Sequence, residues 1–261
     1  MTGPALAGSD VYDNPSFFAR YQQMRQASAG LNEDLEQPAM ARLLPDVRGL
    51  TVLDLGCGDG ALARKLALVG AHHVLGVDAS ERMLAMATSS PCPRVTYLHA
   101  DLEALHRPAQ SADPVVSSLA LHYVRGYRAL AGRIASWLRP GGHLVFSIEH
   151  PACTAPNPMT GWLATASGTA WPLDGYADES ARTQRWLGAD VVKYHRRTAT
   201  IVDAILAAGL TLTGLDEPAP DDAAVARRPD LAQHRRRPPL LVLAARRPVS
   251  VPPTAALTPR P

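Results

Sequence analysis

The stretch T-V-L-D-L-G-C-G-D-G, residues 51–60, decides the fold. Two β-branched residues and a leucine lead into Asp54, and glycines then alternate with other residues, which predicts a buried strand, a tight turn and a helix over 61–69. Glycine accepts left-handed backbone angles and leaves no Cβ between the main chain and a ligand. A helix beginning at Gly60 also directs its free N–H groups and positive dipole end to that crevice. The stretch therefore predicts a site for an adenosine-containing cofactor.

Two classes of cofactor fit this turn. Gly56, Gly58 and Ala61 match the dinucleotide pattern, and Asp78 follows about 20 residues later, where a ribose-binding acid is expected. Asp54 stands ahead of the glycines and supplies the polar acceptor that a cofactor with an amino-acid tail needs near the turn. Because Asp54 could equally stabilise the turn through loop amides, the turn alone leaves both classes open.

Four motifs in chain order separate the classes. They are D-L-G-C-G-D-G at 54–60, G-V-D-A-S at 76–80, A-D-L at 100–102 and L-R-P-G-G-H-L-V-F at 138–146. Together they resemble a class I S-adenosylmethionine-dependent methyltransferase of the type 11 small-molecule group. The resemblance implies S-adenosylmethionine as cofactor and methyl transfer to a carbon, oxygen or nitrogen atom of a small molecule, in bacterial secondary metabolism.

The pattern of apolar runs predicts the same fold. Strands are expected near 51–55, 73–78, 94–99, 113–118, 142–148, 211–216 and 239–245, with helices near 60–69, 80–88, 126–138 and 194–208. Alternating strands and helices form a mostly parallel sheet covered on both faces. The fold class is thus α/β, a Rossmann-like seven-stranded sheet, parallel except for a C-terminal antiparallel strand, with an N-terminal helical lid and a substrate-cap insertion.

The chain is expected to form a single methyltransferase domain over 11–246. Residues 11–48 are the helical lid, although plain packing of an amphipathic helix explains this segment equally well. Residues 150–190, rich in Pro, Gly and Trp, are the substrate-cap insertion, since long connections in compact domains usually carry function. Residues 1–10 and 247–261 are expected to be flexible tails, and the Arg-bearing stretch 219–237 a solvated loop.

The resemblance assigns cofactor contacts to individual residues. Asp78 would accept hydrogen bonds from the ribose hydroxyls, the alternative being a cap for the helix near Ser80. Asp101 and the Leu102 amide would bind the adenine edge. The full cofactor set is Tyr12, Tyr21, Arg25, Asp54, Gly56, Cys57, Gly58, Asp78, Ala79, Met83, Asp101, Leu102, Ser118 and Leu119.

A sulfonium methyl is already activated, so a base is required only when the acceptor must lose a proton. Four residues near expected strand ends are candidates: His150, Glu149, His122 and His195. His150 is the first choice because histidine titrates near neutral pH. Three further strings resemble one subgroup of type 11 enzymes: E-H-P at 149–151, W-P-L-D-G-Y at 171–176 and V-V-K-Y-H-R at 191–196.

Composition narrows the remaining function classes. The 261 residues carry a formal net charge of +2, which indicates neither a nucleic-acid nor a membrane partner. Three scattered cysteines show no metal or disulfide pattern, and with no secretion signal the expected location is the cytoplasm. A small-molecule substrate is the expected partner, and a homo-oligomer is compatible with the sequence. The alternatives are an NAD(P)-dependent oxidoreductase on the same fold and a non-catalytic S-adenosylmethionine-binding protein.

Overall fold

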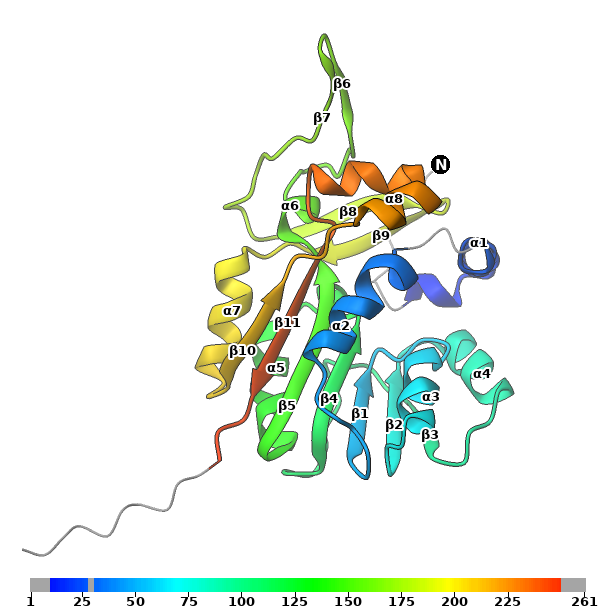
Figure 1. The fold of residues 1–261 in the computed structure, drawn as a ribbon, viewed down its shortest axis with the longest axis vertical. Helices are drawn as coiled ribbons and strands as arrows, with labels where there is room; N and C mark the ends of the chain where they lie inside the picture. Colours follow the sequence, from blue (N-terminus) through cyan, green and yellow to red (C-terminus); the bar gives the residue numbers. More distant parts are fainter. Residues whose placement is uncertain (1–9, 28–30, 250–261) are drawn as a thin grey trace, which may run out of the picture.

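The computed structural model describes residues 10–27 and 31–249, and at its centre lies a seven-stranded sheet in the order β10-β11-β5-β4-β1-β2-β3 (Figure 1). β11 runs antiparallel to its neighbours β5 and β10, and the other pairings in this sheet are parallel. The strands are β1 (Thr51–Leu55), β2 (His73–Asp78), β3 (Val95–His99), β4 (Ala112–Ser118), β5 (Leu138–Glu149), β10 (Thr211–Asp216) and β11 (Leu240–Arg246). The expected Rossmann-like sheet, with one antiparallel strand near the C-terminus, is confirmed.

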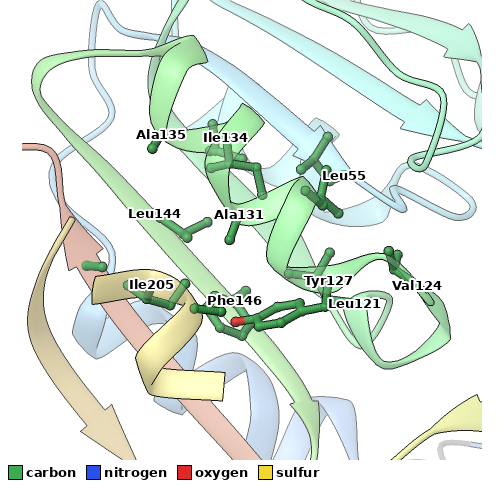
Figure 2. Packing of buried hydrophobic residues seen from close by; sticks show 14 of the residues in the cluster. Leu55, Leu121, Val124, Tyr127, Ala131, Ile134, Ala135, Leu144, Phe146 and Ile205 are labelled. Atoms are coloured by element: carbon green, nitrogen blue, oxygen red, sulfur yellow. The ribbon is translucent and has the colours of Figure 1, made fainter. Parts of the chain in front are cut away.

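Helices cover both faces of the sheet because successive side chains of each strand point to opposite faces. Leu53 and Leu55 of β1 pack with Phe146 of β5 against the helices of one face, as Figure 2 shows for Leu55 and Phe146 beside Tyr127. Val52 of β1 packs on the opposite face. The helices are α2 (Gln37–Leu43), α3 (Ala61–Leu68), α4 (Glu81–Ser89), α5 (Tyr127–Trp137) and α7 (Thr198–Ala207). Each fully buried side chain of this size stabilises the fold by about 1.5–3 kcal/mol, so the strand ends are held firmly.

The N-terminal segment packs against an inserted hairpin rather than against the sheet alone. It comprises a 3-10 helix (Asp10–Asp13), α1 (Pro15–Gln26) and a π-helical turn (Asn32–Glu36) that leads into α2. α1 begins where Asn14 accepts the backbone N–H groups of Ser16 and Phe17. Phe17 then contacts the ring of Trp186 edge to face, with centroids 5.3 Å apart. The hairpin consists of β8 (Ala181–Trp186) and β9 (Ala189–Tyr194).

The rest of the insertion lies between β5 and β8. It begins with the short helix α6 (Pro151–Thr154) and continues into a second hairpin, β6 (Leu163–Thr165) and β7 (Gly168–Ala170). This hairpin projects at the top of the molecule in Figure 1, and the side chains of both its strands are exposed. The insertion therefore has a solvated tip and a base that joins the body of the protein.

Three sequence predictions need correction or completion. The helix expected from Tyr194 begins at Thr198, since Tyr194 ends β9. The stretch 219–237 is not a plain solvated loop: it contains α8 (Asp222–Arg227) and a 3-10 helix (Pro229–Arg235), and Arg237 is buried. Of the expected flexible tails, 1–9 and 250–261 lie outside the described residues.

Within the part of the chain that the structure describes, no helix is long and apolar enough to cross a membrane.

Candidate functional site

The turn after β1 requires glycine at positions 56 and 60. Gly56 and Gly60 have φ of 70° and 76°, in the left-handed region. A Cβ on Gly56 would lie 2.2 Å from the Cβ of Ala120, and one on Gly60 would lie 2.2 Å from the hydroxyl of Tyr97. The backbone therefore passes close to neighbouring segments here, and α3 begins immediately at Ala61.

Asp78, the last residue of β2, is bonded to the glycine turn of the neighbouring strand. One of its carboxylate oxygens accepts the Gly58 N–H at 2.8 Å and the other accepts the Ser80 N–H at 2.9 Å. Ser80 caps α4 with its own hydroxyl, which accepts the Met83 N–H. Burial raises the pKa of Asp78, although the hydrogen bonds from the backbone partly oppose the shift. Asp78 is thus a partly buried acid at a strand end, free of the helix-capping role.

Asp54 is fully buried, and neither of its carboxylate oxygens has a hydrogen-bond partner within the described residues. Burial, followed by the charges of Asp78 and Glu36, raises the pKa of Asp54 to about 8. A buried carboxylate without partners is costly unless it is protonated or meets a cation. Since Asp54 lines the cavity described below, it is suited to a cationic group of a ligand.

One cavity of about 1240 Å³ extends across the carboxyl ends of the central strands. Part of this volume runs along α2 and α3, away from the strand ends. Every residue that the sequence analysis assigns to the cofactor lines it: Tyr12, Tyr21, Arg25, Asp54, Gly56, Cys57, Gly58, Asp78, Ala79, Met83, Asp101, Leu102, Ser118 and Leu119. The structure therefore brings the whole predicted set together.

The N-terminal segment supplies part of the cavity wall. The hydroxyl oxygens of Tyr12 and Tyr123 are 3.5 Å apart, so the first helical turn meets the segment after β4. Burial raises the pKa of Tyr21 to about 12, which keeps its hydroxyl protonated at neutral pH. Arg25 forms an ion pair with Glu33 at 3.4 Å. This segment thus presents hydroxyls and one paired cation to the cavity.

Glu36 is a cavity residue that the sequence analysis missed. It is 2% exposed, and the same carboxylate oxygen accepts the hydroxyls of Ser118 and Ser147 at 2.8 and 2.7 Å. Burial raises the pKa of Glu36 despite these hydrogen bonds. No motif surrounds Glu36, so only the three-dimensional contacts could have revealed it.

The opposite end of the cavity holds a buried ion pair. Lys193 of β9, 2% exposed, donates to Glu149 at the end of β5 and to Gln184 of β8 at 2.6 Å. Burial alone would raise the pKa of Glu149, but the adjacent ammonium lowers it below the ordinary value. Burial would lower the pKa of Lys193, and the Glu149 carboxylate raises it. Both groups therefore stay charged.

The candidate bases divide into two pairs. His122 and Glu149 line the cavity. The Nδ1 atom of His122 accepts the Glu149 N–H at 3.4 Å, while its buried Nε2 has no partner among the described residues. Burial lowers the pKa of His122 to about 4, so the ring is neutral near pH 7. With Nδ1 accepting, the neutral ring carries its proton on Nε2.

His150 and His195 are not among the residues that line the cavity. The Nδ1 of His150 accepts the Ala152 N–H and thereby caps α6, and its Nε2 lies 2.8 Å from the Glu217 carboxylate. The ring nitrogens of His195 are bonded to the Thr154 hydroxyl and the Tyr176 carbonyl. Both rings are thus held by hydrogen bonds within the insertion and its base.

The sequence analysis gave no role to several further lining residues. They are Gln184, Trp186 and Lys193 of the β8–β9 hairpin, with Trp171, His234 and Arg237. Trp171 and Lys193 do fall within the strings W-P-L-D-G-Y and V-V-K-Y-H-R, so a signal was present without an assigned function. Among the residues that the structure describes, no group of three or more His, Cys, Asp or Glu side chains is arranged to hold a metal ion.

Comparisons with known proteins agree with the observed fold and with a cofactor site at the glycine turn. Residues 52–142 match a family model described as a methyltransferase domain. A Haemophilus influenzae protein that carries no functional name is 34% identical over 246 residues, which cover 91% of this chain and 96% of that one. A crystal structure of an S-adenosylmethionine-dependent methyltransferase from Mesorhizobium loti is 43% identical, covers 84% of this chain and all of that one, and has a TM-score of 0.77.

A more distant structure extends the comparison to a bound cofactor. Phosphoethanolamine N-methyltransferase 2 of Haemonchus contortus, in complex with S-adenosylmethionine, has a TM-score of 0.62. It is 20% identical and covers 94% of this chain and 61% of that one, so it shows a shared fold. The chain belongs to the class I S-adenosylmethionine-dependent methyltransferases, and S-adenosylmethionine is its expected cofactor.

Proposed function

We propose that the protein transfers the methyl group of S-adenosylmethionine to a small-molecule acceptor that lies between the glycine turn and the Glu149–Lys193 ion pair. The supporting observation is that the glycine turn and the Glu149–Lys193 ion pair line the same cavity. The lining of this cavity continues from the cofactor residues to Glu149, Gln184, Trp186 and Lys193, so an acceptor can lie beside the cofactor in the same cavity. The acceptor's place in bacterial secondary metabolism, the cytoplasmic location and a homo-oligomeric state belong to this proposal as sequence-based expectations.

The lining residues fit S-adenosylmethionine. The carboxylate of Asp54, which has no hydrogen-bond partner in the described part of the chain, suits the cofactor's ammonium group. Asp78 stands at the strand end where a ribose-binding acid is expected. Met83 offers an apolar surface to an adenine ring, and Asp101 an acceptor to its amino group. The bound cofactor would supply an activated methyl group, so the protein's task is to orient the acceptor and exclude water.

Two segments are proposed to enclose the reactants. The N-terminal segment would act as a lid over the cofactor, with Tyr12 and Tyr21 facing the cavity. The insertion would cap the acceptor through the β8–β9 hairpin. Arg25, one of the expected cofactor residues, would bind the methionine carboxylate, because its ion pair with Glu33 leaves guanidinium N–H groups for that contact.

The proton chemistry of the acceptor is assigned to Glu149 and His122. Glu149 is held ionised by Lys193 and can accept a proton or orient a donor on the acceptor. The Nε2–H of His122 has no partner among the described residues and can donate a hydrogen bond to an oxygen or nitrogen of the methyl acceptor. Either role requires the acceptor to lie at the β5 side of the cavity.

Calorimetric titration with S-adenosylmethionine, S-adenosylhomocysteine and NAD(H) tests the cofactor assignment. Wild type should bind the two sulfur compounds, and Asp78→Ala should bind them about tenfold or more weakly, because a charged hydrogen-bond acceptor is lost. Glu81→Ala, on the exposed first turn of α4, is the matched acidic control and should bind as wild type. Binding of NAD(H) alone would overturn the proposal.

Turnover is tested separately by following S-adenosylhomocysteine release with a panel of small acceptors. Transfer to at least one compound would support catalysis. Tight cofactor binding with no transfer to any member would favour a non-catalytic S-adenosylmethionine-binding protein.

A further inference from the structure

Arg237 is a buried arginine at the acceptor end of the cavity, and it has no carboxylate partner in the part of the chain that the structure describes. Arg237 follows the 3-10 helix that ends at Arg235, lines the cavity and is 9% exposed. Its guanidinium donates to the Cys153 thiol and to the Pro238 carbonyl, and its buried Nε has no partner within the described residues. Across the same residues it forms no ion pair with a carboxylate.

The neighbouring groups do not neutralise this charge. Glu149 is near enough for Arg237 to help lower its pKa, but Glu149 is already paired with Lys193. Burial raises the pKa of the Cys153 thiol to about 12, so it remains uncharged. Burial and then Arg237 lower the pKa of His234 to about 4, so this ring is neutral too, and its buried Nδ1 lacks a partner among residues 10–27 and 31–249. An uncompensated buried cation is costly, which favours an anionic ligand beside it.

A tryptophan ring fixes the plane of this guanidinium. The guanidinium carbon lies 4.0 Å from the ring centroid of Trp171. The indole N–H of Trp171 donates to the Ala152 carbonyl at 2.7 Å, which anchors the ring to α6. Stacking occupies the face of a guanidinium and leaves its N–H edge available for a bidentate contact with an oxyanion.

We propose that Arg237 binds an oxyanion, a carboxylate or phosphate monoester, on the methyl acceptor. The inference rests on the proposed function because it assigns the chemical class of the acceptor at the same site. Met159 and Leu240 also line the cavity and offer contact to an apolar part of the acceptor. Arg237 acts in recognition, and Glu149 and His122 keep their proposed roles at the reacting atom.

Matched probes test the charge requirement without a known substrate. Protein loaded with S-adenosylhomocysteine, and protein without it, are titrated with 3-phenylpropanoate, phenyl phosphate and the neutral 3-phenylpropanamide. At least one of the two oxyanions should bind, at millimolar concentration or below, and the amide should bind about 10- to 100-fold more weakly, as expected for loss of a charged hydrogen bond. The preferred oxyanion distinguishes a carboxylate from a phosphate acceptor.

Arg237→Gln should lose the oxyanion preference while keeping its affinity for S-adenosylhomocysteine. Arg236→Gln is the matched control, since Arg236 is exposed and contacts Thr169 and Trp162 outside the cavity lining. The acid–amide comparison on wild type requires no variant and stands even if Arg237→Gln does not fold.

Equal binding of acid and amide by wild type, or no oxyanion binding, would overturn the assignment. An Arg237→Gln variant that binds the oxyanion as tightly as wild type would overturn it too. A folded Arg237→Gln variant that loses affinity for S-adenosylhomocysteine would place Arg237 in the cofactor site instead. Failure of wild type to bind S-adenosylhomocysteine would count against the proposed function alone, because the protein without cofactor still reports oxyanion binding.

Discussion

Lys193 of β9 and Glu149 of β5 form an ion pair inside the cavity, which joins the inserted hairpin to the end of a central strand. The ammonium also lies 5.5 Å from the ring centroid of Trp186. The lysine side chain is almost fully buried, and about a quarter of the glutamate side chain is exposed, at 26%. The pair therefore fixes the hairpin and keeps a carboxylate ionised in a largely dry site.

Replacing Lys193 with Met should destabilise the protein by about 2–4 kcal/mol, near the range for breaking a buried pair but reduced because Glu149 is partly exposed. Urea denaturation measures this. In wild type, the lowered pKa of Glu149 contributes stability that is present above the ordinary glutamate pKa of about 4.3 and is lost as pH falls below it. In the variant, burial is the largest remaining influence and raises this pKa, with the nearby Arg237 opposing it in part, so the destabilisation should grow from pH 4 to pH 8.

Arg185→Met is the control for this experiment. Arg185 pairs with Asp190 on the same hairpin, but its side chain is exposed, and such pairs contribute about 0–1 kcal/mol. Equal losses of unfolding free energy in Lys193→Met and Arg185→Met would show that the buried pair stabilises the protein no more than the exposed pair.

Asp54→Asn should stabilise the cofactor-free protein at neutral pH. Because the folded-state pKa of Asp54 is raised to about 8, the native protein holds a proton that the unfolded chain releases above about pH 4. Stability therefore falls as pH rises between these values, by something on the order of 2–4 kcal/mol at pH 7. Asparagine removes this dependence, which thermal unfolding from pH 5 to pH 9 would reveal.

The same variant should bind S-adenosylmethionine more weakly than wild type, since the proposed partner of the cofactor ammonium is gone. If the stability of Asp54→Asn still falls steeply as pH rises, another titrating group causes the pH dependence.

Phe17→Ala should loosen the N-terminal segment before it affects the sheet. Phe17 is fully buried between Tyr12, Tyr21 and Trp186, and removing a buried phenyl ring costs about 3–5 kcal/mol in a core. This loss removes the apolar centre of the contact between the segment and the β8–β9 hairpin, so hydrogen exchange should accelerate over 11–26 and affinity for S-adenosylhomocysteine should drop. Phe18→Ala, a half-buried neighbour, should change both quantities less. Global unfolding of Phe17→Ala would instead place this segment within the main cooperative unit.

His122→Ala should lower turnover more than His150→Ala, the reverse of the order favoured by the sequence. Loss of one hydrogen bond to the acceptor predicts about a tenfold lower kcat. His150→Ala should instead cost about 1 kcal/mol of stability through the lost α6 cap. Since the pKa of His122 is lowered to about 4, kcat should show no limb from this ring between pH 5 and 8. If turnover falls in His150→Ala and not in His122→Ala, His150 is the catalytic base.

Local motifs made the sheet and the cofactor end predictable. The β1 turn fails if Gly56 gains a Cβ, and its partner Asp78 lies at the end of the adjacent strand, so sequence order places both at one edge. The strands of the sheet were predicted to within one residue except β5, which begins at Leu138 and not near 142, because Pro140, Gly141 and Gly142 lie within the strand. Tyr194 was misassigned because the mixed apolar and polar residues of 191–197 carry no clear boundary between the strand and the helix.

The acceptor end depends on contacts that the sequence does not encode locally. Lys193 and Glu149 are far apart in the chain, as are Arg237 and Trp171, and each pair forms only after the insertion has folded back. The stretch 219–237 is polar and therefore predicts solvent exposure, yet Arg237 is buried through stacking. A strand-end position brought His150 to the correct edge of the sheet, but the turn into α6 directed its ring to Glu217.

The edge-to-face contact between Phe17 and Trp186 has a kinetic consequence. The N-terminal segment adjoins the cofactor end of the cavity, and the β8–β9 hairpin adjoins the acceptor end, yet this one contact belongs to both. Arg20 reinforces it by donating to the Leu187 carbonyl at 3.2 Å in the hairpin turn. Under the proposed lid and cap roles, we expect loading of one reactant and escape of the other to share an opening barrier, which would couple the residence times of cofactor and methylated product.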